Sequence, residues 1–324
     1  MTDSPDQTQA PADHDESVIP ADSALPTWLK ELPETSRPYV ALARLDRPVG
    51  IWLLLLPCFM GIALMRIQTG FAWIDIWWAI LFTIGAIVMR GAGCTWNDIT
   101  DREADAKVSR TAGRPIPSGQ VTVRNASLFL AAQLVIGFLV WLCLPFTAKL
   151  WALAAIPLVI AYPYMKRITW WPQAWLGFTF NWGILVAAAT IVGGSLVNFI
   201  QLSTMLVYLG LVCWTIAYDT IYALQDIEDD ALIGVRSTAR LFDDKVLTGI
   251  FVFHLLATAL IALGAWVAGA GRIGAAIGIL FMAHGLWQIT KLSGSKEERA
   301  LAMFRSNVWA GAMIVAGLSL AVIL

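Results

Sequence analysis

The sequence predicts an all-α, polytopic membrane protein with about nine transmembrane helices. Of its 324 residues, 58% are hydrophobic and only 14% are charged, whereas ordinary soluble domains carry about 25% charged residues. Several apolar runs also reach the roughly 20 residues that a helix needs to cross a bilayer. The formal net charge of −1 gives no reason to expect a nucleic-acid partner, so the lipid bilayer is the expected environment.

The N-terminal segment, residues 1–37, is expected to be a disordered acidic tail. Residues 1–29 hold six acidic side chains and neither lysine nor arginine. Such a composition cannot bury enough apolar surface to fold. It lacks the basic and apolar regions of a signal peptide, and it is the opposite of an arginine-rich transit peptide. We therefore expect residues 38–324 to form one membrane domain in a bacterial inner (plasma) membrane rather than in an organelle.

The apolar segments of the membrane domain are long enough to span the bilayer nine times. The links near Ala148 and Ala270 are very short, which predicts that the helices on either side of each link are antiparallel neighbours. The nine segments run over 49–66, 74–93, 124–144, 149–165, 173–193, 203–222, 245–268, 272–291 and 303–324.

The distribution of basic residues indicates which helix ends share a membrane face. With nine helices, nineteen of the 22 lysines and arginines fall on the side of the N-terminus. Only Arg66, Lys149 and Arg272 fall on the other side. The positive-inside rule then predicts a cytoplasmic N-terminus.

A first cluster follows the second predicted helix. It consists of Asp98, Asp101 and Asp105, with Asn97 next to them. At about 100° per residue, the three aspartates fall within roughly 60° of arc, with Asn97 at its edge. One aspartate at a helix centre costs about 2.5–3.5 kcal/mol on insertion scales, and three on one stripe also repel one another. Cations must therefore neutralise them. Carboxylate oxygens without histidine or cysteine are the ligands that Mg²⁺ prefers.

A second cluster follows the sixth predicted helix. Asp219, Asp226 and Asp230 fall within roughly 40° of arc, and Tyr222 lies beside them. Two such clusters predict two Mg²⁺ positions that flank one lipid diphosphate. The alternative is a solvated loop face, which explains Asp219 poorly because residues 214–218 before it are still membrane-type sequence.

Basic residues near the clusters are candidates for binding a leaving diphosphate, because arginine and lysine stabilise departing phosphate groups. The positive-inside bias alone would also place basic residues here, so both explanations stay open for each residue. These residues are Lys107, Arg110 and Arg114 after the first cluster, Arg236 and Arg240 after the second, and Lys166 and Arg167 at the end of the fourth helix.

Together these motifs resemble the UbiA-type intramembrane prenyltransferases over roughly residues 40–324. The chain departs from the superfamily pattern at Tyr222, where some branches carry an aspartate. The resemblance is carried by N-D-x-x-D-x-x-x-D at 97–105, Arg-Pro-Ile-Pro-Ser-Gly at 114–119 and the second aspartate cluster. Three further stretches, at 44–50, 162–167 and 218–226, resemble the branch that prenylates 4-hydroxybenzoate.

The resemblance implies nine helices around a central cavity and transfer of a polyprenyl group from polyprenyl diphosphate to 4-hydroxybenzoate, ortho to the phenol, in ubiquinone biosynthesis. Two alternatives remain, a prenyltransferase with another aromatic acceptor and a secondary transporter. The implied catalytic residues are Asp98, Asp101, Asp219, Asp226 and Tyr222, with Asp105 and Asp230 as further Mg²⁺ ligands. The implied substrate-binding residues are Asn97, Arg47, Arg90, Lys107, Arg114, Lys166 and Arg167.

Overall fold

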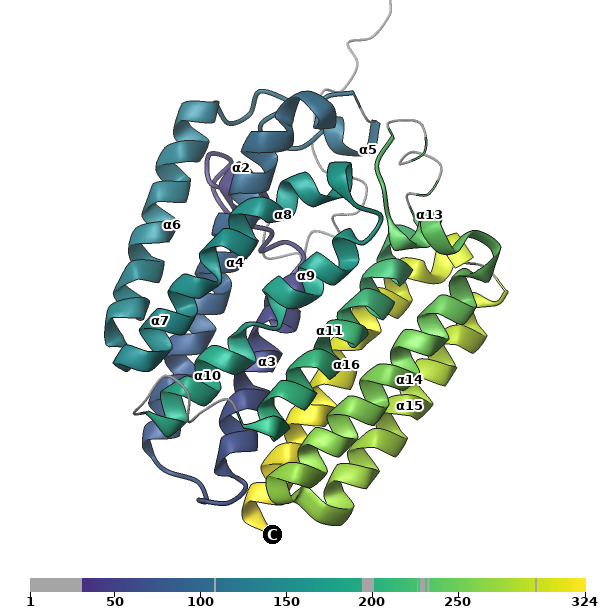
Figure 1. Cartoon of the computed structure of the whole chain (residues 1–324). Coiled ribbons are helices and arrows are strands. Elements are labelled where there is room, and N and C mark those ends of the chain that lie inside the picture. Colours follow the sequence, from purple (N-terminus) through teal and green to yellow (C-terminus); the bar gives the residue numbers. More distant parts are fainter. Residues whose placement is uncertain are drawn as a thin grey trace, which may run out of the picture.

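The regular elements of the protein are all helices in the part of the chain that the structure describes (Figure 1). A computed structural model describes residues 31–107, 109–193, 201–225, 227, 231, 234–294 and 296–324. Most of the expected acidic tail lies outside these residues. The division into a tail over 1–37 and a membrane domain over 38–324 therefore stays a prediction.

Nine spanning segments are present within the described residues, as the sequence predicts. Eight stretches are long and apolar enough to cross a membrane, and the longest of them, Thr238–Leu292, contains two antiparallel helices. The chain reverses at the π-helical turn Trp266–Ala270, where Gly269 has φ 104°. A Cβ would be strained in that backbone conformation, so glycine permits the turn.

The helices of the membrane domain differ from the expected ranges mainly at their ends. Three helices, α2 (Arg37–Leu42), α5 (Ser109–Ala112) and α13 (Thr238–Phe242), are too short to cross a membrane. The spanning helices are α3 (Val49–Arg66), α4 (Ile74–Asp105), α6 (Val123–Cys143), α7 (Phe146–Ala154) with α8 (Ile156–Ile168), α9 (Pro172–Phe180) with α10 (Gly183–Val192), α11 (Leu202–Ala223), α14 (Val246–Ala265), α15 (Gly271–Leu292) and α16 (Lys296–Ile323).

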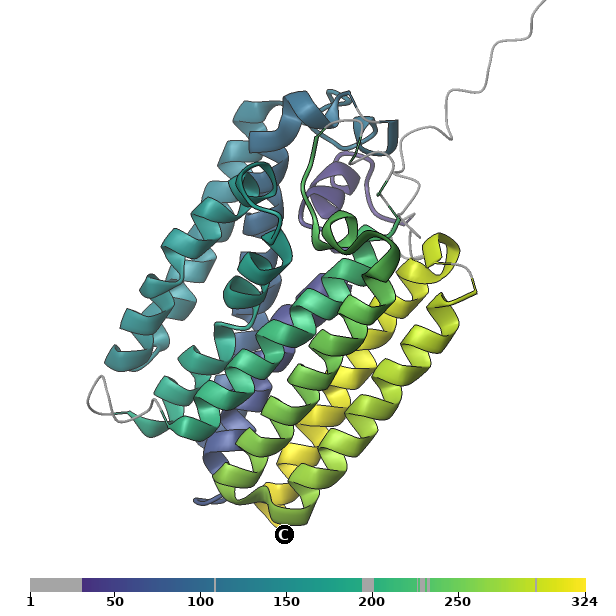
Figure 2. The same ribbon diagram turned by 45° about the vertical axis from the view of Figure 1, so that its right-hand side comes forward.

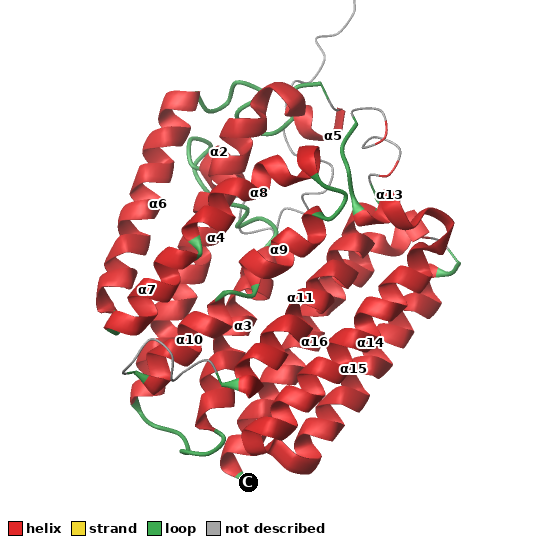
Figure 3. Ribbon diagram, viewed as in Figure 1, coloured by secondary structure: helices red, strands yellow, loops and turns green. Residues whose placement is uncertain are grey.

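Two spanning segments that the sequence predicts as continuous helices are broken. Pro157 stands in the first turn of α8, where its missing N–H removes a bond that would continue α7. The second break, between α9 and α10 (Figure 3), contains Asn181, whose side-chain amide donates to Leu211 O at 3.1 Å and Thr215 Oγ1 at 2.7 Å. These bonds attach the break to α11 and satisfy polar groups that lipid could not.

Helix α11 forms the centre of the bundle. Of its most apolar stretch, 72% is buried, against 11% for α6, whose apolar side chains are left for lipid. Helix α11 lies beside α14 in both views of the molecule (Figure 2). Trp214 of α11 is fully buried, and its Nε1 donates to Asn307 Oδ1 of α16 at 2.9 Å. This buried contact anchors the part of α11 that carries Asp219 and Tyr222.

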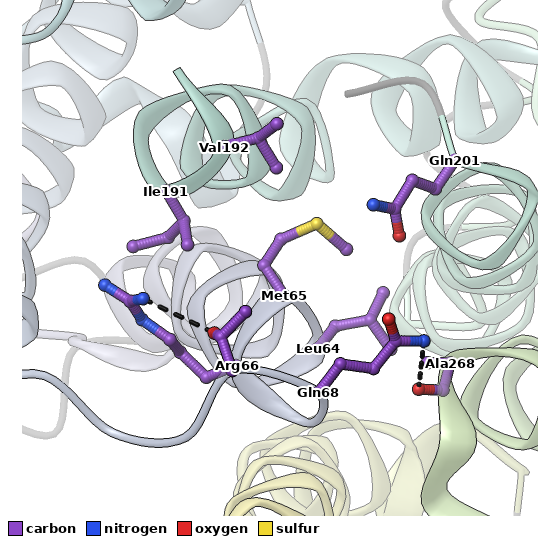
Figure 4. Close-up of a pocket in the computed structure, with 9 residues that line it drawn as sticks. Leu64, Met65, Arg66, Gln68, Ile191, Val192, Gln201 and Ala268 are labelled. Atoms are coloured by element: carbon purple, nitrogen blue, oxygen red, sulfur yellow. Dashed lines mark hydrogen bonds between the residues drawn. The ribbon is translucent and has the colours of Figure 1, made fainter. Parts of the chain in front are cut away.

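The ends of α4, α8 and α11 lie at one end of the bundle, near α5 and α13, while the C-terminus lies at the other (Figure 1). A cavity of about 280 Å³ lies at the end of the bundle that holds the C-terminus. Its lining includes Leu64, Met65, Gln68 and Val192 (Figure 4). It is therefore not the expected central cavity next to the aspartates, which stays a prediction.

Candidate active site

The three aspartates of the first cluster are buried on one face of α4, as the helical spacing predicts. Helix α4 continues past residue 93, the predicted end of this span, to Asp105. Asp98, Asp101 and Asp105 are 0%, 2% and 8% exposed. Three carboxylates so far removed from water require compensating charges or hydrogen bonds close by.

Arginines from two different loops compensate Asp98 and Asp105. Arg44 Nη2 donates to Asp98 Oδ1 at 2.8 Å and to Oδ2 at 3.0 Å. Arg114 Nη1 donates to Asp105 Oδ2 at 2.7 Å and lies 3.4 Å from Asp98 Oδ1. The Arg-Pro-Ile-Pro-Ser-Gly loop thereby brings a cation to the gap between two aspartates about two helical turns apart.

The end of α8 compensates Asp101. Lys166 Nζ lies 2.5 Å from Asp101 Oδ2, and Arg167 Nη2 lies 3.0 Å from Oδ1. The side chains of Lys166 and Arg167 remain 32% and 54% exposed, so both can also meet a ligand that approaches from this end. Basic residues that sequence reasoning assigned to a diphosphate are thus, in this structure, the partners of the aspartates.

The second cluster is described only in part. Asp219, on α11, is mostly buried and interacts electrostatically with Arg90 of α4, which connects the two helices that carry the clusters. Tyr222 packs against Phe304 of α16, with ring centroids 4.8 Å apart. The remaining predicted residues of this cluster, Asp226 and Asp230, lie outside the described residues.

Arg90 has a cradle of its own inside the bundle. Its guanidinium lies over the ring of Phe180, 5.2 Å from the centroid. A Cβ at Gly50 would lie 2.5 Å from Arg90 Nε, so a larger residue there would push the guanidinium aside. The Nε atom is buried without a hydrogen-bond partner in the protein. A buried donor with no partner is a candidate for binding an anionic group of a ligand.

The other residues that the sequence predicts to bind substrate differ in their partners and in their exposure. Arg47 Nη2 pairs with Asp46 Oδ2 at 2.9 Å and acts electrostatically on Asp98. Asn97 is half-buried on α4, and Lys107 is exposed beyond its end. Arg236 and Arg240 lie over the ring of Trp170 instead, and Arg236 Nη1 donates to Ile168 O at 2.7 Å. They therefore attach α13 and the segment before it to the end of α8 and the α8–α9 link.

Arg44 is a site residue that sequence reasoning did not select. It lies 54 residues before Asp98, and no helical spacing connects the two. The available signal was its place in the motif Arg44–Gly50, just before the first spanning helix.

The donor chemistry of the cluster fits a divalent cation that prefers oxygen. Asp98, Asp101, Asp105 and Asp219 offer only carboxylate oxygens, the ligand type that suits Mg²⁺. Among the described residues, however, no three histidine, cysteine or acidic side chains are grouped to hold one ion. The carboxylates of the first cluster already face basic groups, so a bound cation would have to displace the partly exposed ones, Lys166 and Arg167, from Asp101.

Solved structures share this arrangement of helices. A UbiA homolog from Aeropyrum pernix K1 superposes with a TM-score of 0.71 at 25% identity, over 83% of this chain and 97% of that one. A UbiA homolog from Archaeoglobus fulgidus, solved bound to GPP and Mg²⁺, superposes with a TM-score of 0.65 at 17% identity, over 89% of this chain and 100% of that one. The fold is therefore that of the UbiA homologs.

The chain belongs to the UbiA prenyltransferase family, whose model matches residues 54–310. The mitochondrial 4-hydroxybenzoate polyprenyltransferase of Drosophila melanogaster is 42% identical over 301 residues, which cover 92% of this chain and 74% of that protein. The protein of the same name from Aedes aegypti is 41% identical over 289 residues, 87% of this chain, and the match spans 63% of that relative's length. Membership of a prenyltransferase family favours an enzyme over a secondary transporter.

The predicted location in a bacterial inner membrane is wrong. The relatives at about 40% identity are named mitochondrial and come from eukaryotes. The prediction rested on the composition of residues 1–29, and the lack of a transit-peptide pattern there does not decide the compartment. The multi-pass membrane character stands.

Proposed function

We propose that this chain transfers a polyprenyl group from polyprenyl diphosphate to the ring of 4-hydroxybenzoate, ortho to the phenol, and releases diphosphate, as a step of ubiquinone biosynthesis. Relatives about 40% identical over most of the chain are named for this activity. The observation that carries the proposal is the group of three buried aspartates and four basic side chains at one end of a membrane bundle.

The aspartates are the proposed ligands of Mg²⁺, with Asp98 and Asp101 on one side and Asp219 and Asp226 on the other. Asp105 and Asp230 complete or orient the ligand shell. Magnesium bound there supplies positive charge to the departing diphosphate. This role agrees with the oxygen-only donor set and with the Mg²⁺ bound in the archaeal homolog.

The basic residues are proposed to hold the diphosphate as the bond between the allylic carbon and its oxygen breaks. The electron pair of that bond leaves with the diphosphate, and Lys166, Arg167 and Arg114 stabilise the added charge through charge-assisted hydrogen bonds. Lys166 and Arg167 suit this role because both are partly exposed at the end of α8. Asn97 and Lys107 are expected to contribute further contacts.

The carbon left behind is an electron-poor allylic group that water would trap. Tyr222 is proposed to lie beside it, because Tyr222 follows Asp219 by about one turn of α11 and its ring packs against that of Phe304. The electron-rich faces of such rings attract positive charge. The surrounding apolar core excludes water from this region. The acceptor ring then forms the new carbon–carbon bond and loses the ring proton that the prenyl group replaces.

Arg90 is the proposed anchor for the carboxylate of 4-hydroxybenzoate. Its Nε is buried and has no hydrogen-bond partner in the protein, and its guanidinium packs directly against Gly50. Arg47, the other predicted anchor, is paired with Asp46. Arg90 therefore has the stronger case, since a free buried donor gains more from a carboxylate than a paired one does.

The test is direct. Membranes that contain the chain are incubated with labelled 4-hydroxybenzoate, a polyprenyl diphosphate and Mg²⁺, and the extracted product is weighed by mass spectrometry. Parallel reactions with dihydroxynaphthoate, haem and chlorophyllide test the other acceptors. Product of the expected mass from 4-hydroxybenzoate alone supports the proposal, and product only from another acceptor contradicts it.

A further inference from the structure

We propose that Arg44 is a positioning residue: a fixed internal counter-ion that orients Asp98 for a divalent cation and does not itself bind the diphosphate. The inference deepens the proposed function and rests on it in one respect, that a divalent cation acts at the first aspartate cluster.

The backbone of Arg44 indicates that its direction is enforced. Arg44 stands between α2 and α3 with φ 57°, a left-handed conformation that is unfavourable for a residue with a Cβ. A strained residue persists only where the surrounding structure holds it, and such residues gather at functional sites. Here the conformation directs a buried side chain onto a carboxylate of α4.

Both arms of the guanidinium are in use. Nη1 donates to Ala41 O at 3.0 Å, and Nη2 donates to both oxygens of Asp98, at 2.8 and 3.0 Å. Turning toward a substrate would break all three bonds. Lys166 and Arg167 differ, since they lie at the end of α8 with partly exposed side chains that can change partners.

The bonds from Arg44 leave Asp98 able to take a further ligand. A carboxylate has about four lone-pair directions, and Arg44 uses one on each oxygen. Without Arg44, the nearest remaining cation is Arg114, 3.4 Å from Asp98 Oδ1 and already bonded to Asp105. Asp98 would then turn toward Arg114 and compete with Asp105 for it, which draws both carboxylates away from an incoming ion.

The consequence is specific to the cation. Groups that orient metal ligands change metal affinity or activity by about 10–100-fold when they are removed. Arg44→Gln should therefore raise the Mg²⁺ concentration at half-maximal effect by about 10–100-fold. At saturating Mg²⁺, the variant should recover most of kcat and keep the KM for polyprenyl diphosphate.

The experiment uses the purified full chain in detergent, with two readouts. One is the thermal unfolding midpoint as a function of Mg²⁺ concentration in the presence of inorganic diphosphate, which needs no prenyl transfer. The other is the Mg²⁺ titration of product formation. The matched control is Arg102→Gln. Arg102 lies on the end of α4 that carries Asp98, but it pairs with the exposed Glu103 at 3.0 Å and not with Asp98. Arg102→Gln should match the wild type in both readouts.

A half-saturating Mg²⁺ concentration that stays at the wild-type value in Arg44→Gln overturns the inference. A lower metal-free midpoint with unchanged Mg²⁺ dependence also overturns it, because that result marks a purely structural role. Should Arg44→Gln fail to fold, Arg44→Lys decides. It keeps the charge without the planar fork, so it must still raise the half-saturating Mg²⁺ concentration, and a wild-type value overturns the inference.

The two proposals fail in different ways. If the wild type makes no prenylated 4-hydroxybenzoate but its thermal titration differs from that of Arg44→Gln as expected, the proposed acceptor is wrong and the role of Arg44 stands. If Mg²⁺ with inorganic diphosphate leaves the wild-type midpoint unchanged, the role of Arg44 is overturned.

Discussion

Substituting Asp98 by alanine and by asparagine separates its structural role from its proposed metal role. Asp98 is 0% exposed, and the Arg44 side chain that bonds it is 10% exposed. Alanine removes the counter-ion of a buried guanidinium, a change that costs about 3–5 kcal/mol in proteins. Arg44 keeps its bond to Ala41 O, and Arg114 keeps Asp105. We therefore expect a loss near the lower limit, about 3 kcal/mol of unfolding free energy.

Asparagine keeps an oxygen that accepts from Arg44 Nη2, while it removes the charge that would hold a cation. A hydrogen bond to a charged group contributes about 1.5–3 kcal/mol, so Asp98→Asn should lose less unfolding free energy than Asp98→Ala. Transfer should nevertheless fall at least about 1000-fold, because losing about 4 kcal/mol of transition-state stabilisation slows a reaction by three factors of ten.

Thermal unfolding of the purified variants measures the loss of stability, and the amount of prenylated product measures the loss of transfer. The control is the double variant R44M/D98L, which replaces the pair by apolar groups. It should regain the stability lost in Asp98→Ala without regaining transfer, since apolar replacements of buried ion pairs are often neutral or stabilising. Equal unfolding midpoints for the alanine and asparagine variants would refute the ion-pair reasoning. Near-normal turnover in Asp98→Asn would refute the metal assignment.

Four further outcomes are expected. EDTA should abolish transfer and Mg²⁺ or Mn²⁺ should restore it, with Ca²⁺ restoring little because it favours larger oxygen shells; full activity in metal-free buffer contradicts this. Lys166→Gln should raise the KM for polyprenyl diphosphate about tenfold or more, since one charge-assisted hydrogen bond contributes about 1.5–3 kcal/mol, and an equal rise for the acceptor would speak against a diphosphate role. Gly50→Ala places a Cβ 2.5 Å from Arg90 Nε and should raise the KM for 4-hydroxybenzoate selectively, so an unchanged KM excludes Arg90 as its anchor. Single cysteines at Ser118 and Ala270, in a cysteine-free background, should react with an impermeant maleimide from opposite membrane faces, because an odd number of spanning segments separates them; labelling from one face would show that the order of helices is wrong.

The helices and the first aspartate cluster could be predicted because both depend on local patterns. Apolar runs of bilayer length fix a spanning helix whatever surrounds it. The helical period alone places Asp98, Asp101 and Asp105 on one stripe. The break after Asn181 could not be predicted, because it depends on bonds to Leu211 and Thr215, residues far along the chain.

The partners of the aspartates could not be predicted either, because these contacts also join residues that are far apart in the chain. Lys166 and Arg167 were recognised as site residues, yet their pairing with Asp101 depends on how α8 packs against α4. Arg44 was missed because a loop delivers it, and loops have no period from which a direction could be calculated. Sequence patterns thus predicted which charges gather in the site, and the packing of the helices decides which charge compensates which.

The paired charges at the end of α4 imply that a divalent cation and a diphosphate bind together. Asp101 is 2% exposed and is compensated by Lys166 and Arg167. Those two side chains can turn to a diphosphate only if another cation replaces them, because a buried carboxylate without a counter-ion is costly. A divalent cation that binds alone would displace Lys166 and Arg167 from Asp101 when no anion is present to pair with them. Each ligand therefore removes the obstacle to the other, and this exchange requires mobile partners at Asp101 and a fixed one, Arg44, at Asp98.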